Sequence, residues 1–203
     1  MTVIIATVQT FEEAAQVVTR VWADVGKSHI IRFEAFDGMG KSGLAQLVAA
    51  KIGAEHVEVD KFAFKPELQK PYRDCLRKEE LDAKISEVIA SRKPVILDAV
   101  CLDEVAPRSQ WGRGFVVYIK RLSFNNPDPT WHEGFGLEDE ETPTDEPHRG
   151  VFLYHQRSKP HQRADLIIEI PDLGHRILNF SFDRRKCFDP PGAKVLPYRG
   201  SQA

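Results

Sequence analysis

Short apolar runs that alternate with amphipathic stretches constrain the fold of this chain more than any other feature. Near-continuous apolar segments occupy Val95–Val100, Phe115–Ile119 and Leu166–Ile170, which is typical of strands buried on both faces of a sheet. Segments with helical periodicity lie at Phe11–Val25 and Glu79–Ser91. Strands that alternate with helices predict an α/β fold, a three-layer sandwich with a mostly parallel central sheet.

The first third of the chain continues this alternation. Three further strands are predicted over Val3–Val8, His29–Phe36 and His56–Val59. Thr10 is a suitable N-cap for the helix that begins at Phe11. A small-residue helix over Leu44–Ile52 is predicted to stop at Gly53. The strand that begins at His56 is predicted to end at Asp60.

The charges of the chain are segregated. The sequence holds 28 Lys+Arg and 30 Asp+Glu, a net charge of −2, which argues against a nucleic-acid binder. Between Leu122 and His148 there are eight acidic residues and no Lys or Arg, so the rest carries 28 basic against 22 acidic residues. Because this segment is also rich in proline, we expect an acidic surface insertion over about 122–148. A weakly patterned basic tail follows over about 172–203.

Cysteine usage and the N-terminus indicate the class of protein. Cys75, Cys101 and Cys187 are widely spaced and odd in number, which argues against a disulfide framework or a cysteine zinc site. The first residues lack the bases of a signal peptide, and no run approaches the ~20 apolar residues of a membrane span. We therefore expect a cytoplasmic protein with no membrane partner.

A glycine-rich loop carries the most specific motif. The residues from Ala35 to Ser42 read A-F-D-G-M-G-K-S between a predicted strand and a predicted helix, and they depart from the pattern G-x-x-x-x-G-K-[ST] only at Ala35. Gly38 and Gly40 permit torsions that turn backbone N–H groups toward a phosphate. Lys41 would reach the β- and γ-phosphates, and the Ser42 hydroxyl would bind Mg²⁺. The predicted nucleotide-binding residues of this loop are Asp37, Gly38, Met39, Gly40, Lys41, Ser42 and Gly43.

Two carboxylates lie at or near the ends of predicted strands. Asp60 follows the strand that begins at His56, and Asp98 lies within the apolar run Val95–Val100. Ligands of open parallel sheets bind outside the carboxyl ends of the strands. A phosphoryl transfer to a hydroxyl needs one acid to orient the acceptor and another to hold magnesium. We assign the first role to Asp60 and the second to Asp98, together with Ser42.

This set of motifs resembles the uridine kinase-like group of P-loop small-molecule kinases. The resemblance covers about residues 30–170 and implies a P-loop nucleoside triphosphate hydrolase fold. In that family an Asp-x-Phe element supplies the acceptor-orienting base, which falls on Asp60 in the sequence Asp-Lys-Phe. Later family elements match His148-Arg-Gly150, Tyr154, Pro160 and Ala164-Asp165 in order. By this likeness Arg149 belongs to the lid and is catalytic, with Lys41 and Asp60.

Basic residues provide further candidates. Between Pro147 and Ala164 the chain carries four bases and no acid: Arg149, Arg157, Lys159 and Arg163. Arginine suits the stabilisation of charge on a transferring phosphoryl group, so we expect Arg149 and Arg157 to close over the nucleotide. Candidate residues for the acceptor follow the Asp60 region: Tyr72, Arg73 and Arg77.

Together these observations predict a single kinase-like domain over residues 1–203. It would use ATP and Mg²⁺ to phosphorylate a hydroxyl of a small metabolite, first of all a nucleoside-like compound. The departures from the family pattern leave two alternatives open. One is a nucleotide-binding regulatory or interaction protein, with the acidic insertion as its partner surface. The other is a kinase for an already phosphorylated acceptor, held by Arg73 and Arg77. The sequence indicates no oligomeric state.

Overall fold

The computed structural model describes residues 3–36, 38–63, 70–122, 144, 146 and 148–171. Its strands are β1 (Ile4–Thr7), β2 (Ile30–Ala35), β3 (Glu55–Glu58), β4 (Val95–Ala99), β5 (Phe115–Leu122) and β6 (Leu166–Pro171). Its α-helices are α1 (Phe11–Asp24), α2 (Lys41–Ile52), α3 (Lys78–Ala90), α4 (Leu102–Val105), α5 (Arg108–Trp111) and α6 (His148–Ser158). Short 3-10 helices cover Val59–Phe62, Tyr72–Cys75 and Pro160–Arg163.

The strands form one sheet of six in the order β1-β6-β5-β2-β4-β3. Every described pairing is parallel, which confirms the predicted α/β class. β2 lies in the middle, between β5 and β4, and the chain leaves it toward β3 on one side and later returns to β5 on the other. The carboxyl end of β2 is therefore a topological switch point, where ligands of such sheets bind.

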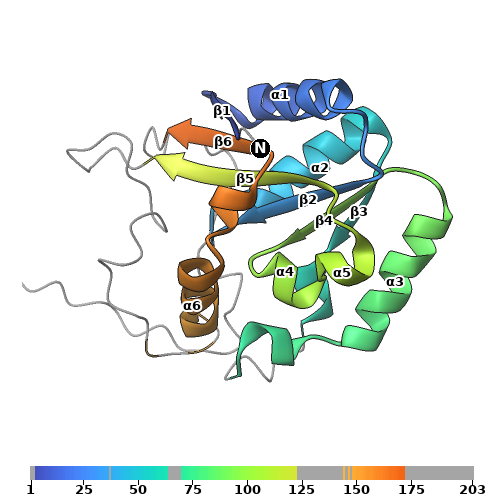
Figure 1. Cartoon of the computed structure of the whole chain (residues 1–203), viewed down its shortest axis with the longest axis vertical. Coiled ribbons are helices and arrows are strands. Elements are labelled where there is room, and N and C mark those ends of the chain that lie inside the picture. The colour runs from blue at the N-terminus through green and yellow to red at the C-terminus, as the bar shows by residue number, and fades with distance from the viewer. Residues whose placement is uncertain are drawn as a thin grey trace, which may run out of the picture.

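Helices cover both faces of the sheet, as the three-layer prediction requires (Figure 1). Apolar side chains of α1 and α2 pack with Ile31 and Phe33 of β2 in one buried cluster. Side chains of α3, α4 and α6 pack with Leu97 and Ala99 of β4 in a second cluster on the opposite face. Figure 1 shows α3 and α6 on either side of α4 and α5.

The N-terminal β1–α1 unit extends the sheet. β1 pairs with β6 at the sheet edge, and α1 packs beside α2 on one face. The predicted N-cap is confirmed, since the Thr10 hydroxyl accepts a hydrogen bond from Glu13 N at 3.1 Å. The structure also confirms the helix stop at Gly53, which has a left-handed φ of 67°.

Several boundaries differ from the predicted ones. β3 ends at Glu58, two residues early, and the chain then turns into the 3-10 helix Val59–Phe62. α2 begins at Lys41, three residues before the predicted start at Leu44. The four-residue helices α4 and α5 had no counterpart in the predictions, because such short segments show little periodicity.

Some predictions concern residues outside the described ones: Asp37, nearly all of the acidic insertion, Cys187 and the basic tail. Among the residues that are described, no helix is both long enough and apolar enough to cross a membrane.

Candidate functional site

The glycine-rich loop lies between β2 and α2, at the switch point of the sheet. Gly38 and Gly40 have φ angles of 76° and 81°, in the left-handed region that favours glycine. Gly40 is the N-cap of α2, so Lys41 and Ser42 are its first two residues. The first backbone N–H groups of a helix point outward with the positive end of its dipole, which is a favourable environment for phosphate.

Met39 and Gly43 are two further residues of the loop that were predicted to bind the nucleotide, and their surroundings differ. The Met39 side chain is buried in the cluster beneath α1 and α2. This side chain therefore anchors the loop to the core. At Gly43 a Cβ atom would meet nothing within 4 Å, so this residue borders open space at the start of α2.

Lys41 and Asp60 face each other across the site. Lys41 Nζ lies 4.0 Å from Asp60 Oδ2. Lys41 is only 7% exposed, whereas Asp60 is half-buried in the turn after β3. This turn brings Asp60 to the carboxyl edge of the sheet although β3 itself has already ended. The carboxylate is thus both reachable and close to the loop lysine.

Asp98 is buried within β4, on the side of the sheet that α2 covers. It pairs in register with Phe33, whose side chain packs against α2. Asp98 is 1% exposed, and His56 Nε2 lies 3.3 Å from its Oδ1. Burial by itself would raise the pKa of Asp98, but His56, Lys41 and Ser42 outweigh burial and hold that pKa below its ordinary value. Asp98 is therefore an ionised carboxylate beside the start of α2.

The surroundings of Asp98 fit a magnesium ion. Within the described part of the chain, the contacts of His56, at 3.3 Å, and of Ser42 with this carboxylate fall short of full hydrogen-bond geometry. A buried carboxylate with incomplete hydrogen bonds is costly unless a cation or water adds to its partners. Carboxylate and hydroxyl oxygens are ligands that Mg²⁺ accepts, so Asp98 and Ser42 could hold this ion.

The three acceptor candidates have different environments. The Tyr72 hydroxyl donates a hydrogen bond to Asp60 Oδ1, so Tyr72 belongs to the same cluster. Arg73 is exposed and lies 3.5 Å from the Asp74 carboxylate. Arg77 pairs with Glu80 at 3.0 Å and donates to the backbone oxygen of Lys61 at 3.1 Å. The two arginines thus interact with local acids and backbone.

The lid candidates lie on α6. Arg149 is exposed in its first turn. Arg157 is exposed near its last turn, where it pairs with Glu104 at 3.2 Å. Of the remaining bases of the predicted cluster, Arg163 pairs with Asp103 at 3.0 Å, next to the partner of Arg157, and Lys159 lies in a left-handed turn after α6. Arg149 lies beside the segment Pro71–Cys75, which we call the Tyr72 turn, since its neighbour Gly150 packs against the backbone of Pro71 and Tyr72.

Sequence reasoning missed a buried polar network on the other face of β2. Arg32 and Glu34 are each 1% exposed. Glu34 Oε1 accepts hydrogen bonds from the Tyr154 hydroxyl of α6 and from Leu102 N, the latter at 3.2 Å. Arg32 donates to the backbone oxygen of Ala106. The signal was present in the sequence, since two charged residues interrupt a run that should be buried on both faces.

His155 is a second unpredicted buried group. Its Nε2 lies 2.9 Å from the backbone oxygen of Val100, and its ring meets Phe36 edge-on at 5.1 Å between centroids. Burial, ahead of the other causes, lowers the pKa of His155 to about 4, so the imidazole is neutral at pH 7. Tyr154 and His155 together attach α6 to the strands that flank the phosphate loop.

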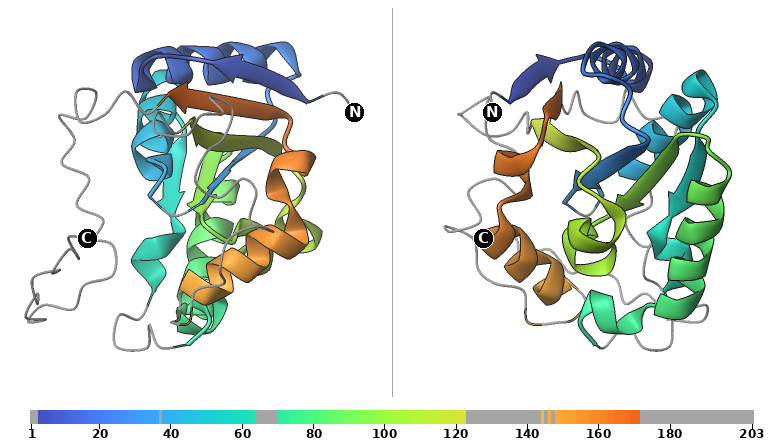
Figure 2. Two further views of the ribbon diagram at one scale, coloured as in Figure 1. Left: turned by 90° about the vertical axis from the view of Figure 1, so that its left-hand side faces the viewer. Right: turned by 45° about the vertical axis from the view of Figure 1, so that its right-hand side comes forward.

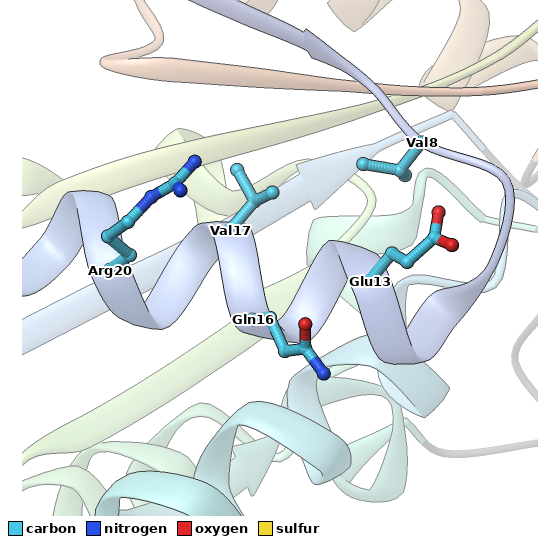
Figure 3. A pocket seen from close by; sticks show the side chains of 5 residues that line it. All are labelled: Val8, Glu13, Gln16, Val17 and Arg20. Carbon is cyan, nitrogen blue, oxygen red and sulfur yellow. The ribbon is translucent and has the colours of Figure 1, made fainter.

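A separate hollow of about 450 Å³ lies along α1. Val8, Glu13, Gln16, Val17 and Arg20 line it (Figure 3). None of these residues belongs to the cluster around Lys41, Asp60 and Asp98. The hollow is therefore distinct from the candidate site.

Comparisons with known proteins support the fold. No family model and no curated protein matches the sequence. Among solved structures, a protein of Bacillus stearothermophilus described as a possible uridine kinase matches with a TM-score of 0.50. The match covers 77% of this chain and 97% of that chain at 10% sequence identity. At this identity the likeness concerns the fold alone: the protein has a P-loop kinase-like fold.

Proposed function

We propose that the protein is an ATP- and Mg²⁺-dependent kinase that phosphorylates a hydroxyl of a small metabolite, with nucleoside-like compounds as the first class to test. One observation carries the proposal. Lys41, Asp60 and Asp98 come from distant parts of the sequence and meet at the carboxyl ends of three neighbouring strands, β2, β3 and β4. A phosphate loop, a half-buried carboxylate that a ligand can reach and a buried carboxylate are the groups that phosphoryl transfer to a hydroxyl requires.

The proposed roles follow from the environments of the groups. The loop and the start of α2 bind the phosphates, and Lys41 neutralises their charge. The Asp60 carboxylate orients the acceptor hydroxyl and takes its proton as the oxygen bonds to the γ-phosphorus. The bond to the β–γ bridging oxygen breaks, and ADP leaves. Mg²⁺, held by Ser42 and Asp98, would supply additional positive charge on the phosphate oxygens.

The arginines near Asp60 favour an acceptor without a phosphate group. A phosphorylated acceptor would need free guanidinium groups beside Asp60. Arg73 and Arg77 instead lie against Asp74 and Glu80, and recruiting them would break these contacts. Arg149 and Arg157 remain the proposed lid residues, and Arg157 would have to leave Glu104 to reach the nucleotide.

The decisive experiment combines nucleotide binding with ATP consumption over a panel of nucleosides, sugars and vitamins. Lys41→Ala should lower turnover about 100-fold or more, because the variant loses the charge that stabilises the transferring group. Lys51→Ala is the matched control, since Lys51 lies at the other end of α2 in an exposed pair with Glu12. Wild-type turnover in Lys41→Ala would refute the proposed mechanism.

Asp60→Asn separates catalysis from binding. This variant should bind ATP as the wild type does and lose about 100-fold or more in turnover, because general-base catalysis is removed. If the wild-type protein binds ATP but consumes it with no acceptor of the panel, the regulatory alternative is favoured. Deleting residues 125–145 then tests that alternative, since a partner surface there would be lost while ATP binding survives.

A further inference from the structure

The Asp60 carboxylate accepts a hydrogen bond from a buried tyrosine. Tyr72 is 2% exposed, and its hydroxyl donates to Asp60 Oδ1. Burial, reinforced by the charge of Asp60, raises the pKa of Tyr72 well above its ordinary value. The phenol therefore keeps its proton and remains a donor throughout the physiological pH range. The two oxygens of the carboxylate thus differ, since Oδ1 faces Tyr72 and Oδ2 faces Lys41 Nζ at 4.0 Å.

The turn that carries Tyr72 is packed against the first turn of α6. A Cβ atom built on Gly150 would lie 3.6 Å from Pro71 Cα and 3.7 Å from Tyr72 N. The two backbones therefore lie close together, with room between them for a Cβ atom but for little more. Both views in Figure 2 show the segment around residues 72–75 beside the same end of α6. Glu146 stabilises this end of the helix, since its Oε2 accepts a hydrogen bond from Gly150 N at 2.9 Å.

The second half of α6 is attached to the core. The Tyr154 hydroxyl donates to Glu34 of β2, and His155 Nε2 lies 2.9 Å from the backbone oxygen of Val100, just after β4. The side chains of Glu34, Tyr154 and His155 are all buried. Because these strands also carry the phosphate loop and Asp98, α6 is a rigid connection between the loop side of the site and the Tyr72 turn.

We propose that Tyr72 is a positioning residue for Asp60, and that the first turn of α6, packed on it at Gly150, holds Tyr72 in place. The inference rests on the proposed role of Asp60 as the acceptor-orienting base. Tyr72 fixes the rotation of the carboxylate so that Oδ2 is presented to the acceptor hydroxyl. Through this contact α6 acts on the acceptor side of the site, in addition to carrying the proposed lid residues Arg149 and Arg157.

Kinetics test the hydrogen bond. Tyr72→Phe should lower kcat about 10- to 100-fold, because a small misplacement of a reacting group is costly, and should leave the KM for ATP unchanged. Ser28→Ala is the control. It removes a hydroxyl that donates to the backbone oxygen of Ile30 at 3.0 Å, at the amino end of β2 and not in contact with Asp60 or α6, and it should keep the wild-type kcat. A wild-type kcat in Tyr72→Phe would overturn the proposal.

Fluorine NMR tests the same contacts without any activity. The sequence has 4 tyrosines, so protein labelled with 3-fluorotyrosine gives a small set of resonances, and Tyr72→Phe assigns one of them. Asp60→Asn should shift the Tyr72 resonance. Gly150→Val should shift it as well, because its methyl groups have no room above the Pro71–Tyr72 backbone. Gly150→Ala should shift it less, since its Cβ makes ordinary contacts there and mainly displaces the Glu146 carboxylate at 2.9 Å.

The two experiments separate the possible failures. If Asp60→Asn and Gly150→Val leave the Tyr72 resonance unchanged, the positioning role is wrong whether or not the protein transfers phosphate. If the resonance moves as expected while no acceptor is phosphorylated, the contacts from α6 to Asp60 are upheld and the proposed function fails.

Discussion

At the scale of single residues, Glu34 is a carboxyl group that is almost completely buried from water. Burial raises the pKa of Glu34 to about 7, although its hydrogen bond from Tyr154 acts in the opposite direction. Below about pH 4.5 the carboxyl group is protonated in both the folded and the unfolded chain. As pH rises from there toward 7, the unfolded chain releases this proton and the folded chain retains it. The contribution of Glu34 to stability therefore falls with rising pH over this window.

Glu34→Gln should remove this dependence. Glutamine keeps an oxygen that can accept from Tyr154 and Leu102 N but carries no charge. Relative to the wild type, the variant should become progressively more stable from pH 5 to pH 8, by up to about 3 kcal/mol. Urea unfolding at several pH values measures this difference. His155 has the opposite dependence, since its lowered pKa makes stability fall as pH drops from 6.5 toward 4, but both proteins contain it and its effect cancels.

The control is Glu87→Gln, at an exposed glutamate of α3 that pairs with Lys84. The free energy of unfolding of this variant should change with pH in parallel with that of the wild type. Parallel curves for Glu34→Gln as well would contradict the assigned role of burial.

Some polar residues in and around the site could be predicted from the sequence and others could not. Lys41, Ser42 and Asp60 stand in or beside motifs whose spacing reflects chemistry. Asp98 was identifiable because a lone carboxylate in an apolar strand must be compensated. Glu34 also interrupts an apolar strand, which shows that it needs compensation, but its partners Tyr154 and Leu102 are far away in the sequence and only the fold identifies them.

At the scale of elements, α1 shows how local sequence sets a boundary. The Thr10 hydroxyl accepts from Glu13 N at 3.1 Å, and Glu13 Oε2 accepts from Gln9 N at 2.8 Å. The first bond satisfies a backbone donor that the first turn of a helix leaves without a partner, and the second ties the residue before the N-cap to the same turn. The same local chemistry made the start of α1 predictable, as did the glycine at the end of α2.

Thr10→Ala should destabilise the protein by about 1 kcal/mol, because it removes the side-chain acceptor at the N-cap. Thermal unfolding monitored by circular dichroism measures the loss. Thr19→Ala is a control within the same helix. In the described structure the Thr19 hydroxyl has no hydrogen-bond partner, and alanine is the better helix former, so this variant should be neutral or slightly more stable. An equal loss in both variants would argue against the cap.

Elements defined by long-range contacts were harder to predict. The strands were recognisable because strands covered on both faces must be apolar along their whole length. The end of β3 was placed too late, since its pairing with β4 stops at Glu58 and the next residues, Val59 and Asp60, continue the strand-like sequence. The lengths of α4 and α5 depend on the return of the chain from β4 to β5 and have no signal of their own.

At the scale of the whole molecule, the β1–α1 unit precedes all the residues of the candidate site in the sequence and yet reaches that site. A Cβ atom on Gly40 would lie 2.4 Å from Phe11 Cζ, so the Phe11 ring packs directly on the phosphate loop. The ion pair of 2.6 Å between Glu12 and Lys51 lies at the other end of α2, away from the loop. The unit therefore supports the loop from outside the sheet, at the point where only glycine fits.

Phe11→Ala should reveal this support as a loss of nucleotide affinity. Val18→Ala is the comparison, because Val18 is fully buried in the same helix but lies about two turns after Phe11. Both variants should destabilise the protein by about 1–4 kcal/mol, as truncations of packed side chains do. Only Phe11→Ala should also weaken ATP binding, because the backbone of Gly40 loses the ring that restrains it. Calorimetric titration at a temperature where both variants are folded measures the difference, and an equal affinity in the two would show that α1 contributes stability alone.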